Sequence, residues 1–310
     1  MAQYDVELMI KVAELYHVDD MPQREIAQKL NISRPKVSRL LKAAKENNLI
    51  EIRINYPLPP RSQLEKIFER EFNLKEAVIV KNQIGKNRIF SEVTAAAAKY
   101  VKRIVKDGNS IGVAWGRTLR AVAELIEMSE KKDVKVIQII GSMGQSSTSA
   151  NEIVRKIAES FGGSYYLLPA PAIVNSPDIK DALMKDDTIK NILYMAKAVD
   201  IALIGIGSVN KNSSFFASGY LKKEDLQALT QRNAVGDICA HFFYVDGKIC
   251  EYIDDRVIAV SLEDLRKIPR VIGVALGDDK AKSIVGALKS GVLDVLITDE
   301  KTAESVLIHK

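Results

Sequence analysis

The residues best placed for chemistry in this chain are basic side chains gathered on one short helix. Segment 26–45 holds six lysine or arginine residues and no aspartate or glutamate. Apolar residues recur in its second half at the i, i+3, i+4, i+7 spacing of one buried helical face, namely Val37, Leu40, Leu41 and Ala44. A short helix with a packed back and a basic front fits the major groove of duplex DNA. The pattern therefore predicts a DNA-recognition helix.

The elements around this helix predict a helix-turn-helix. We expect a first helix over 23–30, a turn over 31–33 and the recognition helix over 34–47. Ser33 is a suitable N-cap, and Pro35 falls in the first turn of the recognition helix, where its missing N–H costs nothing.

A further helix over 6–16 and a strand over 50–54 complete a small winged core, with Arg53 on the polar face of the strand. The residues expected to contact DNA are Gln23, Ser33, Arg34, Pro35, Lys36, Ser38, Arg39, Lys42 and Arg53. The alternative is a solvated basic face, since pairs of amphipathic helices joined by a polar turn are common.

From residue 75 onward, apolar strands alternate with helices, which predicts a mostly parallel sheet covered on both faces. The expected strands are 77–80, 110–114, 134–140, 165–168, 201–205, 271–275 and 295–297. The expected helices are 90–105, 118–128, 151–161, 186–198, 223–232 and 280–289, with a short one at the end. Segment 241–252 departs from this alternation, because its Asp246-Gly247 pair predicts a hairpin at the sheet edge or beside a pocket. An additional helix over 63–72 packs on the body of its own chain, with a helical linker that also pairs with a second subunit as the alternative.

Four loops at the carboxyl ends of predicted strands share glycine and small polar residues; they are 112–118, 141–149, 205–208 and 277–280. Ligands bind at this edge of open parallel sheets, and helix N-termini favour an anion there. A phosphorylated small molecule fits this inventory. The candidate contacts are Gly116, Arg117, Thr118, Gly141, Ser142, Gly144, Ser146, Gly207, Ser208, Asp237 and Lys280.

Each of these loops has a structural interpretation as well. Glycine after a strand often serves only the turn, and none of the four matches a dinucleotide fingerprint or a P-loop. Trp115 either packs in the core or lines the pocket. The carboxylates of Asp237 and of the Asp255-Arg256 pair either accept hydrogen bonds from sugar hydroxyls or form surface ion pairs.

The composition sets the limits of the interpretation. A chain of 310 residues suits two domains, and we expect a DNA-binding domain over 1–56 and an effector domain over 57–310, with 57–73 as linker and helix. No leader and no apolar run long enough for a membrane span is evident. Cys239 and Cys250 are expected as reduced core thiols, with a bond across a hairpin as the alternative. The composition favours a cytoplasmic protein without metal or cofactor.

Four motifs in order resemble the SorC family of bacterial sugar-responsive transcriptional regulators. They are the helix-turn-helix 26–41, Ile-Gly-Val-Ala-Trp-Gly-Arg-Thr at 111–118, Ala-Val-Gly-Asp-Ile-Cys-Ala-His-Phe-Phe at 234–243, and Lys280 followed by 283–288. The resemblance covers nearly the whole chain. It implies a Rossmann-like α/β effector domain related to sugar-phosphate isomerases and CoA-transferase-like folds.

The resemblance also implies a phosphorylated sugar as effector and a homotetramer on operator DNA. It assigns to the effector Gly116, Arg117, Thr118, the 141–149 loop, Asp237 and Lys280. Ile140 is apolar where some relatives place a polar or basic side chain, which argues against covalent capture at that position.

The expected function is therefore a sequence-specific transcriptional regulator, a repressor of a carbohydrate-utilisation operon, controlled by a phosphorylated sugar. The alternative is a sugar-phosphate isomerase or hydrolase with an appended DNA-binding domain. Such an enzyme needs a positioned base, and the loops offer only single carboxylates, Asp237, Asp278 and Asp279.

Overall fold

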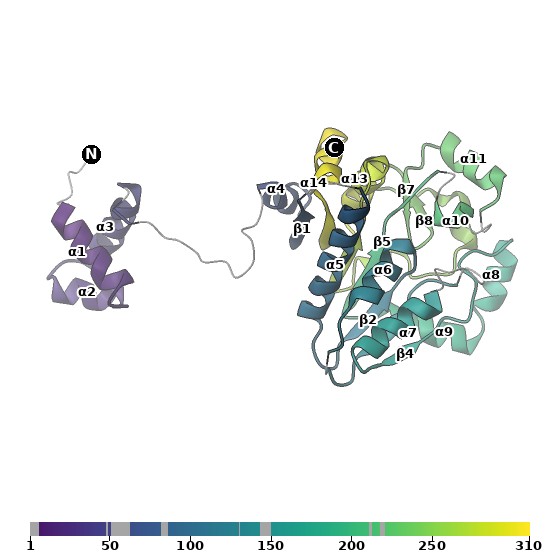
Figure 1. Ribbon diagram of the computed structural model, residues 1–310, viewed down its shortest axis with the longest axis horizontal. Coiled ribbons are helices and arrows are strands. Elements are labelled where there is room, and N and C mark those ends of the chain that lie inside the picture. The colour runs from purple at the N-terminus through teal and green to yellow at the C-terminus, as the bar shows by residue number, and fades with distance from the viewer. Residues whose placement is uncertain are drawn as a thin grey trace. The chain divides into compact units, whose positions relative to one another are not determined.

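The computed structural model divides the chain into two compact units, Met1–Pro60 and Arg61–Lys310. It describes residues 6–47, 49–50, 63–81, 86–129, 131–142, 150–210, 213–217 and 221–310. The predicted boundary between residues 56 and 57 lies outside the described residues. Each unit is considered by itself, the first being the group of purple helices in Figure 1.

The first unit is built from helices α1 (Val6–His17), α2 (Gln23–Lys29) and α3 (Arg34–Glu46). The first two both pack on α3, and the side chains of Val12, Ile26 and Leu40 between them are fully buried. The predicted helix bounds are confirmed to within one residue at each end. Most of the predicted wing strand, with Arg53, lies outside the described residues.

The turn before α3 differs from the sequence prediction in one respect. Ser33 occupies the N-cap position, but its side chain makes no capping hydrogen bond, so its predicted capping role is wrong. Its backbone carbonyl starts the helix instead, accepting hydrogen bonds from the N–H groups of Lys36 (2.9 Å) and Val37 (3.1 Å). The Ser33 side chain is exposed and does not cap the helix.

The second unit is organised around one seven-stranded sheet in the order β1-β10-β9-β5-β2-β3-β4, in which every pair is parallel. Its strands are β1 (Glu76–Val80), β2 (Ser110–Val113), β3 (Lys135–Gln138), β4 (Ser164–Tyr166), β5 (Ile201–Gly205), β9 (Arg270–Val274) and β10 (Val295–Asp299). The central strands are buried almost throughout, as continuous apolar runs predict. The predicted parallel α/β class is confirmed.

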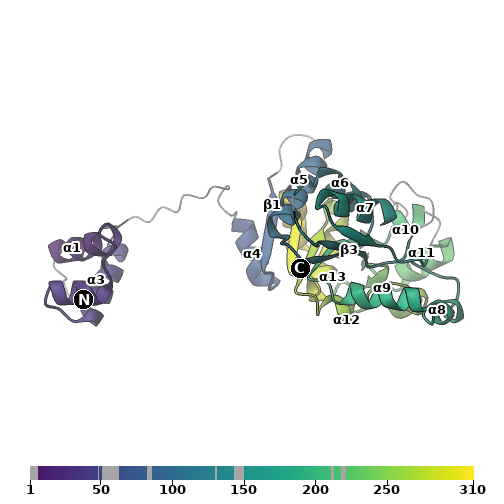
Figure 2. The ribbon, with the colours of Figure 1, turned by 90° about the horizontal axis from the view of Figure 1, so that it is seen from below.

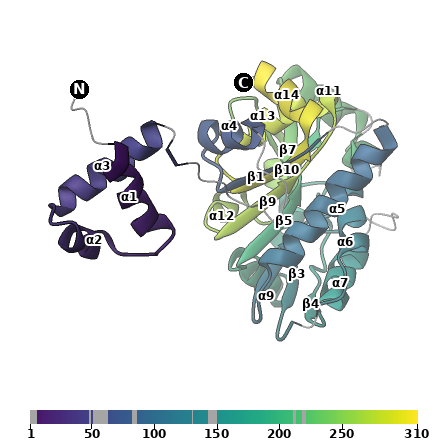
Figure 3. The same cartoon turned by 60° about the vertical axis from the view of Figure 1, so that its left-hand side comes forward.

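Helices cover both faces of this sheet. One face carries α5 (Lys86–Ile104), α6 (Arg117–Leu125) and α7 (Ala150–Ser160), which lie side by side in Figure 3. Figure 2 shows α9 (Asp187–Lys197), α12 (Leu262–Leu265) and α13 (Ala281–Lys289) on the opposite face. The last helix, α14 (Glu300–Ile308), follows β10 directly and packs on α13.

A smaller antiparallel sheet lies between β5 and β9 in the sequence. It consists of β6 (Gly207–Ser208), β7 (Gly236–Ile238) and β8 (His241–Phe243). The predicted turn at Asp246-Gly247 is present, with Gly247 at φ 83° and Tyr244 N–H bonded to Lys248 O. However, the second strand of that hairpin is reduced to a single bridge, Phe243 to Ile249, because β8 pairs with β7 instead.

The remaining short elements belong to neither sheet. They are α8 (Pro177–Leu183), α10 (Ser214–Ala217), α11 (Lys223–Gln231) and the 3-10 turns η1 (Glu251–Arg256) and η2 (Asp278–Lys280). Cys239 and Cys250 are both buried free thiols, which confirms the reduced state predicted for them. Within the described part of the chain, no helix is both long and apolar enough to cross a membrane.

Helix α4 (Gln63–Glu71) lies in the segment 63–72; its packing on its own chain is confirmed, while pairing with a second subunit stays a prediction. It packs on the edge strand β1 of its own chain, and the ring of Phe68 is fully buried there. Phe72 lies against Phe68 with a ring-centroid separation of 5.3 Å. Leu64, Phe68 and Phe72 therefore belong to the core of the second unit or pack against it.

The first unit has so small a core that one buried leucine should decide its folding. Replacing Leu40 by alanine is expected to cost roughly 2–5 kcal/mol, comparable with the whole stability of a domain of this size. We therefore expect Leu40→Ala to unfold α1–α3 while the second unit stays folded, as seen by hydrogen exchange of each unit. Leu49→Ala, at a leucine that is 38% exposed, is the matched control and should retain protection. Protected α1–α3 amides in Leu40→Ala would contradict this account of the core.

Candidate functional site

The candidate ligand site lies where the order of the parallel strands changes direction. From β2 the chain steps outward through β3 to β4, whereas from β5 it steps the other way through β9 to β10. Loops leaving neighbouring strands at such a switch point diverge and open a crevice at the carboxyl edge of the sheet. Here the diverging loops are 114–118 and 206–208, tied at their base by the hydrogen bond from Ala114 N to Leu203 O (3.0 Å).

Three of the predicted residues meet at this edge: Gly207, Asp237 and Lys280, which we call the ionic cluster. Gly207 in β6 is paired with Asp237 in β7. A methyl group on Gly207 would lie 1.8 Å from Asp237 Oδ1, so the carboxylate covers this glycine directly. Lys280 reaches the same loop and donates a hydrogen bond from Nζ to the carbonyl oxygen of Ile206 (2.8 Å).

A tight turn fixes the carboxylate of the ionic cluster. Cys239 and Ala240 join β7 to β8, and both have positive φ (51° and 65°). Residues other than glycine rarely adopt this backbone conformation. Asp237 Oδ2 accepts a hydrogen bond from Ala240 N (3.3 Å) within this turn. The carboxylate is therefore held in place from its own hairpin.

The charges of the ionic cluster disturb one another's protonation. Burial raises the pKa of Asp237 to about 6, although the Ala240 N–H and the charges of Lys280 and His241 oppose the shift. Burial lowers the pKa of Lys280, while Asp237 and Asp279 raise it and the positive charge of Arg117 lowers it further. An anion placed between Arg117 and Lys280 would offset both desolvation and repulsion between the two cations.

Arg117 and Thr118 reach this site from the start of α6. Gly116 is the N-cap of that helix at φ 135°, and its missing Cβ is what permits this backbone conformation. The first N–H groups of a helix have no partner within it and favour an anion. Arg117 is exposed, with its guanidinium 6.0 Å from the centre of the Phe90 ring.

Trp115 joins the two neighbouring loops. Its indole Nε1 donates a hydrogen bond to Gly141 O (3.0 Å), and its ring meets the Phe215 ring edge-on at 4.7 Å. Trp115 is buried, so the core interpretation of this residue holds. Gly141 leaves no room for a side chain, because a Cβ there would lie 2.4 Å from the backbone of Pro171.

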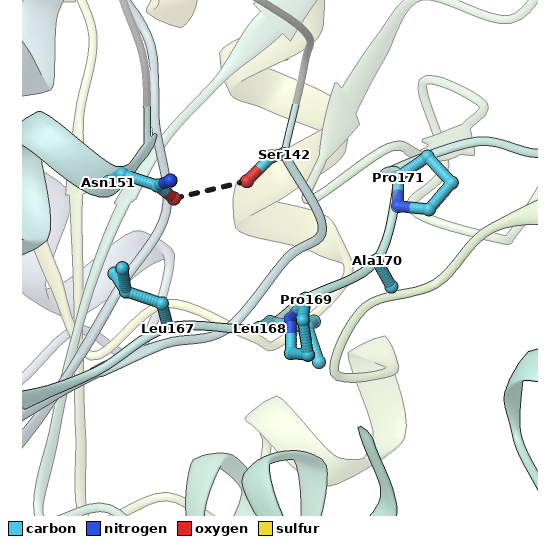
Figure 4. Close-up of a pocket in the computed structure, with 7 residues that line it drawn as sticks. All are labelled: Ser142, Asn151, Leu167, Leu168, Pro169, Ala170 and Pro171. Carbon is cyan, nitrogen blue, oxygen red and sulfur yellow. Dashed lines mark hydrogen bonds between the residues drawn. The ribbon is translucent and has the colours of Figure 1, made fainter. Parts of the chain in front are cut away.

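Ser142 lies beside a separate cavity at the carboxyl ends of β3 and β4. Its hydroxyl donates to Asn151 Oδ1 (3.2 Å) and accepts from Gln138 Nε2 (3.1 Å), as Figure 4 shows for the first contact. The cavity has a volume of about 420 Å³ and is lined by Ser142, Asn151, Leu167, Leu168, Pro169, Ala170 and Pro171. Its lining is mostly apolar and contains no member of the ionic cluster.

The other predicted residues fall as follows. Ser208 is buried in β6, and its hydroxyl accepts a hydrogen bond from Asn210 Nδ2 (2.8 Å). Gly144 and Ser146 lie outside the described residues. Asp255 is exposed, and Arg256 pairs with Asp225 at 2.8 Å, so the ion-pair interpretation holds for that arginine. Within the described part of the chain, no group of three His, Cys, Asp or Glu side chains is arranged to hold a metal ion.

The structure also shows residues that the sequence reasoning missed. Thr302 Oγ1 accepts a hydrogen bond from Gly277 N (2.8 Å) and donates one to Asp299 Oδ1 (2.5 Å). These contacts hold the loop that carries Lys280. The Asp299-to-Thr302 spacing at the start of a helix was an available N-cap signal, and Asp299 does cap α14 through Thr302 N.

The candidate DNA interface lies on the first unit. Of the predicted DNA contacts in α3, Arg34, Pro35, Ser38, Arg39 and Lys42 are exposed, and so is Ser33 just before the helix. Lys36 and Gln23 are half-buried. Among these basic residues of the described chain, Lys42 forms one weak surface ion pair, with Glu46 (3.7 Å), so the face keeps its positive charge.

Comparison with known proteins gives consistent matches over both units. Residues 57–308 match the family model described as "Putative sugar-binding domain", and residues 15–51 match one described as winged helix-turn-helix DNA-binding. The chain is 38% identical over 305 residues to the deoxyribonucleoside regulator of Bacillus subtilis, covering 97% of each chain. It is 30% identical to the sorbitol operon regulator of Klebsiella pneumoniae, covering 98% of each chain.

Solved structures agree with these matches. The full-length sorbitol operon regulator from Klebsiella pneumoniae matches with a TM-score of 0.75, covering 99% of this chain and 100% of that one. A sugar-binding domain of a transcriptional repressor from Vibrio fischeri matches with a TM-score of 0.73 at 35% identity, covering 79% of this chain and 98% of that one.

The raised pKa of Asp237 predicts a particular dependence of stability on pH. Because the folded chain binds this proton more tightly than the unfolded chain, stability falls as pH rises from 3.8 to about 6. Asp237→Asn removes this loss. We expect the variant to gain up to about 3 kcal/mol over the wild type above pH 6, and little below pH 4.

The measurement is chemical denaturation of wild type and Asp237→Asn across this pH range, since the difference between them cancels the other titrating groups. A stability difference that does not change with pH would show that the Asp237 carboxylate is not buried as described.

Proposed function

Because this chain belongs to the SorC family of sugar-responsive transcriptional regulators, we propose that it binds operator DNA through α2 and α3 and senses a phosphorylated sugar at the ionic cluster. One observation carries the proposal. The chain holds an exposed basic recognition helix in one unit and buried, mutually perturbed charges at a sheet switch point in the other.

The DNA half of the proposal rests on the exposed face of α3. Arg34 and Ser38 lie in its first half, where a recognition helix reaches base edges, and Arg39 and Lys42 follow toward its end. Lysine and arginine contacts to phosphates supply most of the salt-dependent affinity, whereas base contacts supply specificity. Val37, Leu40 and Ala44 are fully buried, which fixes the orientation of the basic face.

The effector half rests on the chemistry of the ionic cluster. Arg117, Lys280 and the N-terminus of α6 suit one anionic group, and charge-assisted hydrogen bonds make phosphate the natural choice. The Asp237 carboxylate can accept hydrogen bonds from hydroxyl groups. An anion joined to hydroxyls is a phosphorylated sugar or polyol, and two relatives are named for a sugar alcohol operon and for deoxyribonucleosides.

Control would follow from a difference in affinity between two arrangements of the chain. A sugar phosphate that binds one arrangement better shifts the population toward it, whereas equal affinity for both changes nothing. We propose that the protein acts in the cytoplasm as a repressor and as a homotetramer, in which the effector changes the spacing of recognition helices across half-sites.

The alternative, an isomerase or hydrolase with a DNA-binding unit, has weaker support. The relatives are named as regulators. The ionic cluster contains a single buried carboxylate rather than a pair, and Asp278 and Asp279 are exposed. Sustained turnover of any sugar phosphate by the purified chain would favour the enzyme.

Two screens test the proposal. Selection from a random duplex library should yield a defined binding sequence for the full chain. A thermal-shift screen of ribose 5-phosphate, deoxyribose 5-phosphate, fructose 6-phosphate and sorbitol 6-phosphate should yield a ligand that raises the melting temperature, because ligands that bind only the native state stabilise it. Failure of both screens would overturn the proposal.

Arg39→Ala should weaken binding to the selected duplex by about 5- to 150-fold, the range of roughly 1–3 kcal/mol for one good contact. If Arg39 contacts a phosphate, the slope of log affinity against log salt should fall by about one. The matched control is Lys11→Ala, at an exposed lysine of α1. Unchanged affinity and salt slope in Arg39→Ala, measured by fluorescence anisotropy, would remove this residue from the interface.

Lys280→Met keeps the aliphatic length of the side chain and removes its charge. Loss of a charge-assisted hydrogen bond of about 1.5–3 kcal/mol predicts sugar-phosphate binding weaker by about 10- to 150-fold. Affinity for the duplex without ligand should stay the same. Lys282→Met, at the exposed lysine two residues on, is the control. Normal ligand affinity of Lys280→Met in isothermal titration would refute the phosphate assignment.

A further inference from the structure

We propose that the Asp299–Thr302 pair and two glutamates of α4 form the route by which occupancy of the ionic cluster is transmitted to the linker helix. This inference rests on the proposed function, since it describes how that site controls DNA binding. Hydrogen bonds link the Lys280 loop to the end of β10, and the parallel pairing of β10 with β1 continues the route. Hydrogen bonds then link β1 to α4, the first described helix after the residues that connect the two units.

The first step of the route is the turn that presents Lys280. Gly277 begins this turn at φ 116°, and its N–H donates to Thr302 Oγ1 (2.8 Å). Lys280, three residues later, donates from Nζ to Ile206 O (2.8 Å). The ammonium group has three N–H donors and uses one of them on Ile206 O, so a bound phosphate would draw on the same group. In this proposal, the pull of the phosphate on Nζ is transmitted to the turn.

The second step passes from the turn to the sheet edge. The Thr302 hydroxyl is fully buried and donates to Asp299 Oδ1 (2.5 Å), while Asp299 Oδ2 accepts from Thr302 N (3.1 Å). Asp299 is the last residue of β10, and its partner in the parallel register is Val80, the last residue of β1. Movement of the turn therefore acts on the carboxyl ends of the two strands at this edge.

The third step joins β1 to α4. Glu65 Oε1 accepts a hydrogen bond from Ile79 N (2.9 Å), and Glu69 Oε1 accepts one from Ala77 N (3.1 Å). The two glutamates are one helical turn apart and match alternate N–H groups on the outer side of the edge strand. We call this arrangement the glutamate clamp.

The glutamate clamp adds hydrogen bonds to an interface that apolar packing already stabilises. Phe68, between the two glutamates, is fully buried and already provides the packing of α4 on β1. Charge-assisted hydrogen bonds add direction, so they fix the register of α4 along the strand. A shift at the end of β1 would then alter the register of α4 rather than be absorbed by a soft apolar interface.

Hydrogen exchange of the full-length chain tests the route without knowledge of the ligand. Thr302→Val removes the hydroxyl, and Thr302→Ser keeps it as the matched control. We expect Thr302→Val to raise exchange at least about threefold in the segment 276–281 and also in 75–80 and α4, because locally weakened units open more often. Thr302→Ser should exchange like the wild type. Faster exchange confined to 276–281 would overturn the proposal.

Glu65→Gln with Glu69→Gln provides a second test if Thr302→Val loses protection across the whole sheet. Coupling between two sites is reciprocal, so this double variant should speed exchange in 276–281 as well as in 75–80. Lys66→Gln, at an exposed position of the same helix, is the control. Unchanged exchange of 276–281 in the double variant would contradict the route.

The functional readout is the change in affinity for the selected duplex caused by whichever of ribose 5-phosphate, deoxyribose 5-phosphate, fructose 6-phosphate or sorbitol 6-phosphate shifts the wild type. The Glu65→Gln/Glu69→Gln variant should bind that sugar phosphate normally and show at most about a third of the wild-type response. A full response would overturn the route while leaving the proposed function standing. Absence of a response in the wild type would instead count against the proposed function, and exchange would still decide the route.

Discussion

Two opposite charges taken out of water at one edge of a parallel sheet are the constraint on which the rest of this structure depends. Burial disfavours the charged form of both Asp237 and Lys280, and the attraction between the two charges offsets part of this cost. Lys280 also faces the positive charge of Arg117, which disfavours its charged form further. We propose that a ligand bringing an anion and hydroxyl groups together would offset the cost of burial and the repulsion between the two cations, and that this gain is the physical basis of sensing.

The architecture around these charges follows from where the chain changes direction. Helices cover both faces of the sheet, so the carboxyl ends of β2 and β5 are where the loops diverge and ligand-binding residues can gather. The small antiparallel sheet brings Asp237 over Gly207, and the loop after β9 brings Lys280 to Ile206. Residues from three distant stretches of the sequence are thereby fixed within one small volume.

Much of this could be predicted from the sequence, for identifiable reasons. The recognition helix follows the helical spacing of Val37, Leu40 and Ala44, and the buried strands are continuous apolar runs, so local pattern was sufficient. The loops of the site could be predicted as well, because glycine and small polar residues at strand ends have a recognisable composition.

What failed depends on contacts that no local pattern records. The strands β6 and β7 are too short and glycine-rich to alternate, and exist only through pairing with each other and with β8. Helix α8 was missed although Ser176 and Pro177 mark its start. The predicted side-chain cap of Ser33 did not form, since a suitable residue type does not fix a hydroxyl orientation. The role of the Asp299–Thr302 pair could not be predicted, because it depends on the hydrogen bond that Gly277 N donates to Thr302 Oγ1.

Thermodynamic linkage offers the most direct test of the claim that the ionic cluster and the basic helix belong to one switch. The sugar phosphate that stabilises the protein should be titrated calorimetrically into the free chain and into the chain saturated with its selected duplex. Coupling requires the two dissociation constants to differ by the same factor by which the ligand changes DNA affinity, typically about 5- to 150-fold. Equal ligand affinity in the two titrations would contradict the account, because a ligand indifferent to bound DNA cannot regulate its binding.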